Sequence, residues 1–270
     1  MRSRLRSVYE KLSIGDKTTL SRRFAQTQLL EDLQNLSIED LIGREPVDTQ
    51  VDTAAEYLVG KRVLVTGAGG SIGSELCRQC ARHGARKIVL LEIDELALIT
   101  IHGDLKRAFP DLEIEAVLGD CGDPAVTAHA LRLGQPDAVF HAAAYKQVPL
   151  LEAQLREAVR NNVLATDTVA HLCRESGVDT FVFISTDKAV DPANVLGATK
   201  RFAEMIAQSL DAKSSGTRFV TVRFGNVLGS RGSVITAFTA QIEAGGPVTV
   251  THPEVERYFM LIPEACQLVL

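Results

Sequence analysis

A glycine-rich loop between a short apolar run and an amphipathic segment constrains this chain more than any other feature. The loop, residues 67–73, reads GAGGSIG and directly follows the run Arg62–Thr66. Glycines at every third position between a strand and a helix are typical of a loop that binds dinucleotide phosphates. We expect Gly67 to allow the tight turn, Gly70 to admit the pyrophosphate and Gly73 to let helix and strand approach. The candidate residues of this loop are Gly67, Gly70, Ser71, Ile72 and Gly73.

Short apolar, β-branched runs alternate along the chain with longer segments whose apolar residues recur at helical spacing, such as Ile72, Leu76 and Cys80. Strands that are apolar on both faces, each followed by a helix, indicate a parallel sheet covered on both sides. The sequence therefore predicts an α/β protein with a doubly wound parallel sheet, with a nucleotide across the carboxyl ends of its strands. The runs are Arg62–Thr66, Lys87–Glu92, Glu113–Leu118, residues 137–142, residues 180–185 and residues 219–223.

The charge and hydropathy of the chain exclude several classes of protein. A formal net charge of −5 argues against nucleic acid as a partner. No apolar run reaches the roughly 18–20 residues that span a bilayer, and the basic N-terminus lacks the apolar stretch of a secretory signal. We therefore expect a cytoplasmic protein without a membrane span. Residues 1–60 are predicted to be an N-terminal arm or linker, and residues 61–270 a Rossmann domain with the start of a substrate-binding region.

The chain has five cysteines, an odd number at irregular spacing, which is typical of a reducing compartment. Cys77 and Cys80 form a Cys-x-x-Cys pair, but no second pair of ligands completes a zinc site. Both fall on the helix predicted after the glycine-rich loop. We interpret them as buried helix residues and expect no metal site.

Two further positions address the choice of cofactor. Glu92 ends the second predicted strand, where a carboxylate can bind ribose hydroxyls and would repel a 2′-phosphate. This favours NAD over NADP. Asp120 and Cys121 follow the third strand, where such folds line the adenine pocket, and Asp120 is a candidate partner for the adenine amino group; an ordinary turn aspartate remains the alternative.

Several later segments resemble one family. They are HAAAYKQVPL at 141–150, STDKAV at 185–190, GATK at 197–200, RFGNVLGSRGSV at 223–234 and GPVTVTH at 246–252. They resemble the nucleotide-sugar branch of the extended short-chain dehydrogenase/reductases, and within it the UDP-N-acetylglucosamine 4,6-dehydratases of polysaccharide and glycan biosynthesis. The resemblance runs from about Leu36 to the last residue. It implies a tightly bound NAD, a UDP-sugar substrate and a homo-oligomer.

The resemblance also identifies a departure from the superfamily pattern. Members use a Tyr-x-x-x-Lys pair, in which the tyrosine removes a proton from the sugar and the lysine holds the nicotinamide ribose. Here Lys200 is present, but Leu196 occupies the tyrosine position. Long-form members of this dehydratase group also lack the tyrosine, so Leu196 is consistent with them. The pair Tyr57 and Lys61 has the same spacing but precedes the first strand, so we discard it.

The resemblance assigns the remaining chemistry to three consecutive residues after the fifth strand. In the reaction that the resemblance implies, carbon 4 of the sugar is oxidised and water is then lost across carbons 5 and 6. Asp187 is the expected general acid that protonates the hydroxyl leaving carbon 6, and Lys188 is the expected base that removes the proton from carbon 5. With leucine at position 196, Thr186 or Asp187 must relay the proton from the carbon-4 hydroxyl. An isolated Asp-Lys pair at a strand end would otherwise be interpreted as a surface ion pair.

The other family positions form two groups. His141 is expected to be a packed strand-end residue. The residues expected to line the cofactor are Ala142, Ala143 and Tyr145, together with Lys200, and those expected to bind the substrate are Lys146, Asn226 and Arg257.

Three functions remain open. They are a 4,6-dehydratase, a nucleotide-sugar 4-epimerase, and a catalytically silent NAD-binding protein. The dehydratase is favoured because an epimerase needs no acid-base pair for elimination at carbon 6. We expect the chain to be a fragment of a long-form, membrane-anchored relative, with its C-terminal substrate part truncated.

Overall fold

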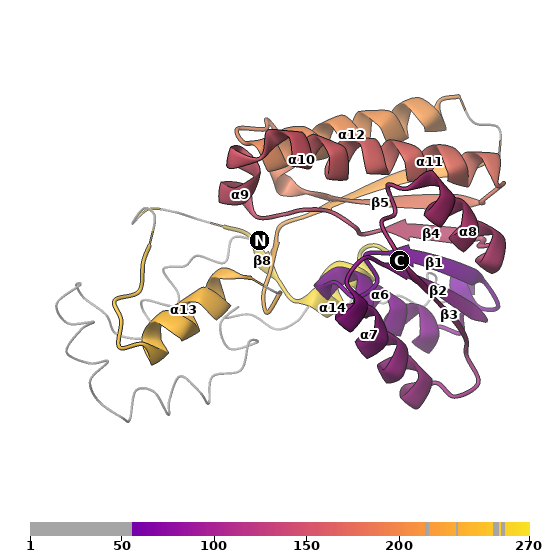
Figure 1. Ribbon diagram of the computed structural model, residues 1–270, viewed down its shortest axis with the longest axis horizontal. Coiled ribbons are helices and arrows are strands. Elements are labelled where there is room, and N and C mark those ends of the chain that lie inside the picture. The colour runs from indigo at the N-terminus through magenta and orange to yellow at the C-terminus, as the bar shows by residue number, and fades with distance from the viewer. Residues whose placement is uncertain (1–55, 214–215, 231, 251–253, 255–256) are drawn as a thin grey trace. The chain divides into compact units, whose positions relative to one another are not determined.

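The computed structural model describes residues 56–213, 216–230, 232–250, 254 and 257–270 (Figure 1). Most of the predicted N-terminal arm lies outside the described residues. The described chain divides into two compact units. The first holds the described part of residues 49–224 together with residues 266–270, and the second holds the described part of residues 225–265.

The first unit is built on a six-stranded parallel sheet with the strand order β3-β2-β1-β4-β5-β6. All six predicted runs are strands, and each end lies within about one residue of its predicted position, as the fully buried β2 and β4 illustrate. The doubly wound parallel fold is thereby confirmed. The strands are β1 (Arg62–Thr66), β2 (Lys87–Glu92), β3 (Glu113–Leu118), β4 (Ala138–His141), β5 (Thr180–Thr186) and β6 (Arg218–Phe224).

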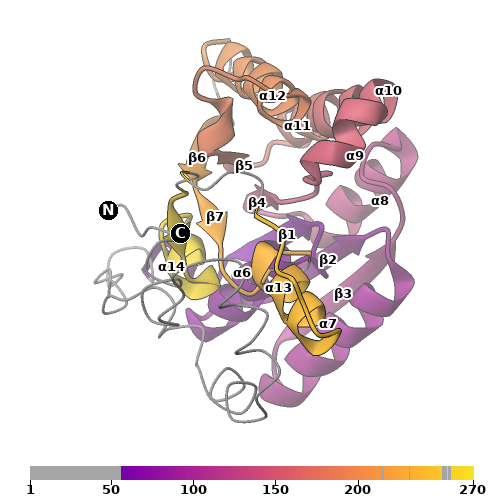
Figure 2. The same cartoon turned by 90° about the vertical axis from the view of Figure 1, so that its left-hand side faces the viewer.

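Helices cover both faces of this sheet, and the views of Figures 1 and 2 place α11 and α12 on the side away from α6 and α7. The helices of this unit are α6 (Ser71–Arg82), α7 (Glu95–Ala108), α8 (Pro124–Gly134), α9 (Val148–Ala153), α10 (Leu155–Val159), the π-helix η1 (Arg160–Leu164), α11 (Ala165–Glu175), the 3-10 turn η2 (Asp187–Ala189) and α12 (Val195–Asp211). Side chains define several starts: Asp94 caps α7, Asp123 caps α8 and Asn194 caps α12.

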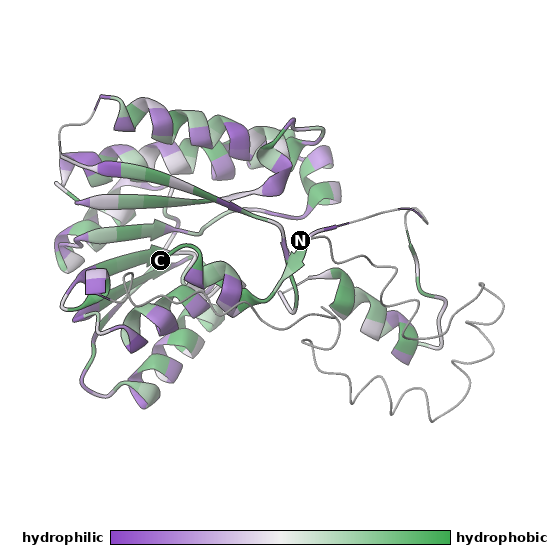
Figure 3. Cartoon of the chain, turned by 180° about the vertical axis from the view of Figure 1, so that it is seen from behind, coloured by the Kyte–Doolittle hydropathy of each residue, from purple (hydrophilic) through white to green (hydrophobic). Residues whose placement is uncertain are grey.

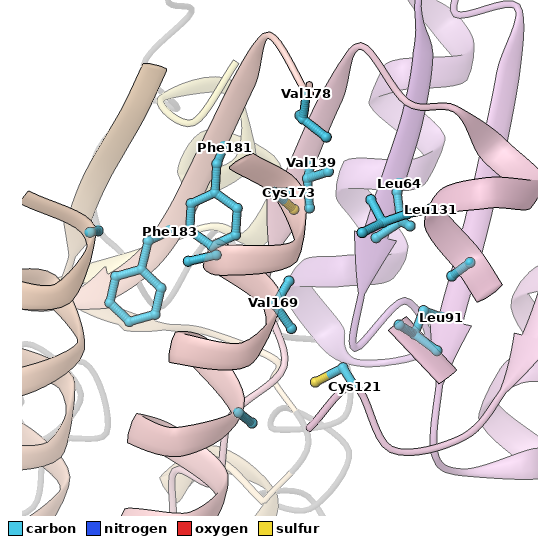
Figure 4. Close-up of a cluster of buried hydrophobic side chains, with 14 of the residues drawn as sticks. Leu64, Leu91, Cys121, Leu131, Val139, Val169, Cys173, Val178, Phe181 and Phe183 are labelled. Carbon is cyan, nitrogen blue, oxygen red and sulfur yellow. The ribbon is translucent and has the colours of Figure 1, made fainter. Parts of the chain in front are cut away.

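The hydrophobic core lies between the sheet and the helices α8, α11 and α12. Alternate residues of the strands point to one face, and these include Leu64, Leu91 and Phe181 (Figure 4). They pack against buried residues such as Leu131 of α8 and Val169 of α11. The strands are coloured mostly apolar in Figure 3, whereas the helices alternate between polar and apolar stripes.

The order of the strands fixes the position of the site. The chain winds outward from β1 to β3 on one side and from β4 to β6 on the other, so β1 and β4 flank the point where the winding reverses. In open parallel sheets, ligands bind beyond the carboxyl ends of the strands at this switch point. The segments that follow β1 and β4 are the glycine-rich loop and residues 142–147.

The second unit contains β7 (Asn226–Val227), α13 (Val234–Glu243) and β8 (Phe259–Met260), and α14 (Ile262–Gln267) follows them. The strands β7 and β8 pair in parallel, and Leu228 and Leu261 form a small core with Ile235. No helix within the described residues is long and apolar enough to cross a membrane.

The five cysteines are buried and unpaired, so the interpretation of Cys77 and Cys80 as buried residues of α6 is confirmed. Burial raises the pKa of the Cys80 thiol to about 12, which leaves it protonated at neutral pH.

Candidate functional site

Two glycines of the loop after β1 are required by packing within the protein itself. Gly67 has a φ of +64°, and a Cβ added there would stand 2.8 Å from the Cα atom of Ala143. A Cβ on Gly73 would stand 2.0 Å from the carbonyl oxygen of Gly67. The backbone of the loop therefore touches both the start of α6 and the segment that follows β4. The positive φ of Gly67 is consistent with the tight turn expected there, and the crowding at Gly73 with the expected close approach of helix and strand.

Gly70 differs, because a Cβ there would meet only the Gly67 carbonyl oxygen, at 3.2 Å. It is the N-cap residue of α6, and its carbonyl oxygen accepts the N–H of Ser74 at 2.9 Å. Apart from the one tight contact with the Gly67 carbonyl oxygen, nothing stands within 4 Å of the Cβ position, which leaves room at the start of a twelve-residue helix for the close approach of a phosphate. The geometry thus fits the expected dinucleotide loop. The additional Gly69 has a separate cause, since a Cβ there would stand 2.5 Å from the Ala97 side chain.

Glu92 is buried at the end of β2 and contacts the same loop. Its Oε2 accepts the N–H of Gly69 at 2.9 Å, and its Oε1 accepts the N–H groups of Ile93 at 2.9 Å and Asp94 at 3.1 Å. The carboxylate therefore holds the glycine-rich loop against the start of α7. The sequence did not reveal this second task; the ribose contact stays a prediction.

The turn after β3 holds Asp120 and Cys121. Asp120 accepts the N–H of Gly122 at 2.8 Å, and Arg160 stands 3.5 Å from its second oxygen. The side chain of Cys121 packs into the main core (Figure 4), and burial raises the pKa of its thiol to about 12. Cys121 can therefore present only its backbone to an adenine pocket.

His141 ends β4 without any exposed surface and lies stacked near Phe181 and Phe183. Its Nε2 is 3.0 Å from the hydroxyl of Thr166, and its Nδ1 is 2.7 Å from the hydroxyl of Thr66. Burial, and secondarily the charge of Lys200, lower the pKa of His141 to about 3, so the ring is neutral.

The hydrogen-bond directions identify the tautomer of this ring. The Thr166 hydroxyl donates to the carbonyl oxygen of Asn162 at 2.9 Å, so it accepts from His141 Nε2–H. Nδ1 is then an acceptor for the Thr66 hydroxyl, whose oxygen accepts the Ala143 N–H at 3.3 Å. His141, which was expected only to pack at the strand end, therefore also links the end of β1 to α11.

Asn162 extends this network toward α12, a connection that the sequence analysis did not identify. Its Oδ1 accepts the N–H of Tyr145 at 2.9 Å, and its Nδ2 donates to the Tyr145 carbonyl at 3.0 Å and the Thr199 hydroxyl at 3.2 Å. Asn162 lies in the π-helix η1, a local geometry that is frequent at functional sites. In the sequence, only the adjacent pair Asn161-Asn162 just before α11 could have drawn attention to this residue.

The candidate catalytic residues Thr186, Asp187 and Lys188 form one hydrogen-bonded turn. The Thr186 hydroxyl and the Lys188 ammonium both donate to Oδ1 of Asp187, each at 3.0 Å. All three are partly exposed. The turn packs on the start of α12 at Gly197, where a Cβ would stand 2.1 Å from the Lys188 carbonyl oxygen.

Lys200 and Leu196 lie on the same stretch of α12. The Lys200 ammonium donates to the Ile184 carbonyl oxygen at 2.8 Å and lies 4.6 Å from the centre of the Phe183 ring. Burial lowers the pKa of Lys200 to about 8. Leu196 is 6% exposed and packs with Leu151 and other apolar residues, so it places no proton-transfer group at the tyrosine position.

The three candidate substrate residues fall in both units. Lys146 is exposed, yet neighbouring atoms partly desolvate its ammonium and lower its pKa. Asn226 lies in β7, where its N–H donates to the Tyr258 carbonyl oxygen at 2.9 Å. Arg257 precedes Tyr258, so the β7–β8 pair brings Asn226 and Arg257 close in the second unit.

Comparison with known proteins extends these observations. The capsular polysaccharide biosynthesis protein CapD of Staphylococcus aureus is 52% identical over 242 residues, covering 89% of this chain and 40% of CapD. The UDP-glucose 4-epimerase of Rickettsia rickettsii is 33% identical over 78% of this chain and 62% of its own length. A double mutant of the dTDP-glucose 4,6-dehydratase DesIV from Streptomyces venezuelae, solved with NAD bound, superposes with a TM-score of 0.67 at 23% identity, covering 76% of this chain and 70% of DesIV.

The strand order and the glycine-rich loop define the Rossmann-type fold of the nucleotide-sugar epimerases and dehydratases. Residues 63–270 match the profile of one family in particular, described as polysaccharide biosynthesis protein. The chain belongs to that family, and it spans about two fifths of the length of its relative CapD.

Proposed function

We propose that this chain carries the NAD-binding and acid-base part of a nucleotide-sugar 4,6-dehydratase whose substrate resembles UDP-N-acetylglucosamine. One observation carries the proposal: Thr186 and Lys188 donate to the same oxygen of Asp187 at the carboxyl end of β5. A hydroxyl, a carboxylate and an amine in contact provide the groups that a water elimination needs. Membership of a polysaccharide biosynthesis family supports a sugar nucleotide as substrate.

The residues present fit NAD as the cofactor. Gly70 and the N-terminus of α6 would hold the pyrophosphate, and Glu92 at the end of β2 favours the unphosphorylated ribose. Lys200 would hold the nicotinamide ribose from α12. NAD held there would supply reversible hydride transfer for carbons 4 and 6 of the sugar.

The protein side chains would move the protons. Thr186 would take the proton of the carbon-4 hydroxyl as its own proton passes to Asp187, along the 3.0 Å hydrogen bond between them. Asp187 would then deliver that proton to the oxygen leaving carbon 6, which departs as water. Lys188 would act as the base that removes the carbon-5 proton, and it would return that proton when the hydride reaches carbon 6. The proton removed at carbon 4 is thereby the one that the leaving group needs.

A 4-epimerase is the second candidate, since the Rickettsia rickettsii relative has that name. An epimerase oxidises and reduces carbon 4 without removing the carbon-5 proton. The turn of residues 186–188 favours the dehydratase, because only elimination needs both an acid and a base beside the cofactor. A catalytically silent NAD-binding protein would require neither.

One experiment separates these functions. Purified protein is incubated with NAD and UDP-N-acetylglucosamine in D₂O, and the sugar nucleotide is analysed by mass spectrometry. A dehydratase yields a product that has lost one water and carries deuterium at carbon 5. An epimerase leaves the mass unchanged and alters the stereochemistry at carbon 4.

Variants of the turn test the assignment of its residues. Lys188→Ala should lower turnover by about 10²–10⁴-fold while NAD still binds, since the glycine-rich loop is unaltered. Asp187→Asn should impair oxidation as well as elimination, because an amide cannot accept the proton that Thr186 releases, so little reduced cofactor should form. Lys106→Ala, at an exposed position of α7, is the matched control. Near-normal turnover in both turn variants would show that Asp187 and Lys188 are only a surface pair.

A further inference from the structure

A carboxylate with no exposed surface lies on α12, one helical turn after Lys200. Glu204 is 0% exposed, and four hydrogen bonds reach its two oxygens. Oε1 accepts from the Ser185 hydroxyl at 2.6 Å and from Arg223 Nε at 2.7 Å. Oε2 accepts from a second nitrogen of Arg223 and from Arg201 Nη1 at 3.1 Å. Two donors on each oxygen occupy the accepting positions of an ionised carboxylate.

Glu204 and Lys200 contact consecutive residues of β5. Residues four apart on a helix share one face, and here the Lys200 ammonium binds the Ile184 carbonyl while Glu204 accepts from Ser185. The next residue of β5 is Thr186. Two polar contacts therefore fix α12 against the strand end immediately before the turn of residues 186–188.

In the buried surroundings of Lys200, the charge of Glu204 affects whether the Lys200 amine is protonated. Burial disfavours the ammonium form, while the nearby charge of Glu204 favours it. Two further titratable side chains lie near the Lys200 ammonium. They are Cys121, in the turn after β3, and His141 of β4, whose ring is neutral. Burial alone would raise the pKa of Glu204, but the hydrogen bonds from Arg223, Ser185 and Arg201 keep it below its usual value.

We propose that Glu204 is a positioning residue that keeps the Lys200 amine protonated and fixes it, with the turn of residues 186–188, at the carboxyl end of β5. The inference rests on the proposed function, because Lys200 is there the residue that holds the nicotinamide ribose. A buried ion cluster is weak evidence for a gain in stability, since apolar side chains of similar volume often replace one without loss. The position of Glu204 beside Lys200 gives the cluster a functional reason.

The titration of Lys200 tests this directly. The protein is prepared with ¹³C-labelled lysine, and the Lys200 signal is assigned by its absence from Lys200→Arg. In Glu204→Gln, which keeps the shape and removes the charge, the midpoint of the Lys200 titration should fall by about one pH unit, because opposite charges nearby shift a pKa by roughly 1–3 units. Glu204→Asp, which keeps the charge, should restore much of the midpoint.

A second variant keeps the test decisive where Glu204→Gln does not fold. Arg201 is partly exposed, and Arg201→Gln removes a positive charge that neutralises Glu204, so the midpoint of Lys200 should rise. An unchanged midpoint in Glu204→Gln, or in Arg201→Gln when the first variant does not fold, would overturn the inference and leave the cluster a packing feature.

Calorimetry of NAD binding against pH separates this inference from the proposed function. If Lys200 holds the ribose as a cation, NAD affinity should fall at alkaline pH as Lys200 loses its proton. In Glu204→Gln this fall should begin about one pH unit lower than in the unmodified protein, so that the variant binds NAD roughly tenfold more weakly at the same alkaline pH. If the unmodified protein binds no NAD at all, the proposed function fails, whereas the Lys200 titration still decides the role of Glu204.

Discussion

The neutral, buried His141 should make the stability of the protein depend on pH in a calculable way. The ring has no exposed surface and a pKa of about 3, whereas an exposed histidine titrates near pH 6.5. Between these values the unfolded chain binds a proton that the folded protein excludes. The stabilising contribution of this neutral ring is complete above about pH 6.5 and is lost as the pH falls toward 3. The loss is about 1.4 kcal/mol for each pH unit.

The variant His141→Asn isolates this contribution. An asparagine amide can still donate toward Thr166 and accept from Thr66, but it does not titrate. At neutral pH the variant should be less stable, by roughly 1–3 kcal/mol, through poorer packing and hydrogen bonding. Because every other titrating group is common to both proteins, the unfolding free energy of the unmodified protein should fall by about 2 kcal/mol relative to that of the variant between pH 6.5 and pH 4.5, so the difference between them should vanish or reverse.

Urea unfolding followed by circular dichroism at a series of pH values measures this difference. A ¹⁵N spectrum should also show a protonated Nε2 and an unprotonated Nδ1 that persist below pH 6. A stability difference that stays constant from neutral to acid pH would refute the reasoning, since it would mean that His141 titrates alike in the folded and unfolded chain.

The other predictions concern the dinucleotide loop and are read by calorimetry with circular dichroism as the control for folding. Gly70→Val should abolish NAD binding while the fold survives, because the added side chain meets little protein but occupies the phosphate position; unchanged affinity would place the cofactor elsewhere. Gly73→Ala should weaken NAD binding and also lower the free energy of unfolding by about 1–3 kcal/mol, because its Cβ would stand 2.0 Å from the Gly67 carbonyl oxygen. NAD should bind more tightly than NADP. Glu92→Ala should reduce this difference in affinity and weaken the binding of both cofactors, since the substitution also removes the acceptor of the Gly69 N–H. An unmodified protein that binds NADP more tightly would contradict the assignment.

The strands could be predicted because burial on both faces leaves a continuous apolar run in the sequence. β2 reads KIVLLE and is buried throughout. The edge strand β3 has an exposed Glu113 and a half-buried Glu115, but its aliphatic residues still mark it. The glycine-rich loop was equally readable, because its three glycines recur at a fixed spacing between a strand and a helix, and Gly70 and Gly73 both approach the Gly67 carbonyl. Residues 1–55 lie outside the described chain, so their expected role as an arm or linker stays a prediction.

The polar partners of the site could not be predicted, because each joins segments far apart in the sequence. Nothing near Asn162 in the chain indicates that its amide binds both backbone groups of Tyr145. The bond from Ser185 to Glu204 likewise depends on how α12 packs against β5. Sequence spacing reports the local geometry of one element, whereas these contacts depend on the register between elements.

The loss of the tyrosine at position 196 has a consequence for where protons can move in the proposed reaction. Leu196 packs into an apolar cluster with Leu151 and Ala158, so the side chain at the tyrosine position cannot accept a proton. Thr186 is hydrogen-bonded to Asp187, and a hydroxyl can accept one proton as it donates another. The carbon-4 proton would then pass to the carboxylate that must later protonate the leaving group. Oxidation and elimination would thus be coupled through one carboxyl group, so Thr186→Val should impair the first step even with Asp187 and Lys188 intact. Normal formation of reduced cofactor in Thr186→Val, in a single-turnover measurement, would exclude this route.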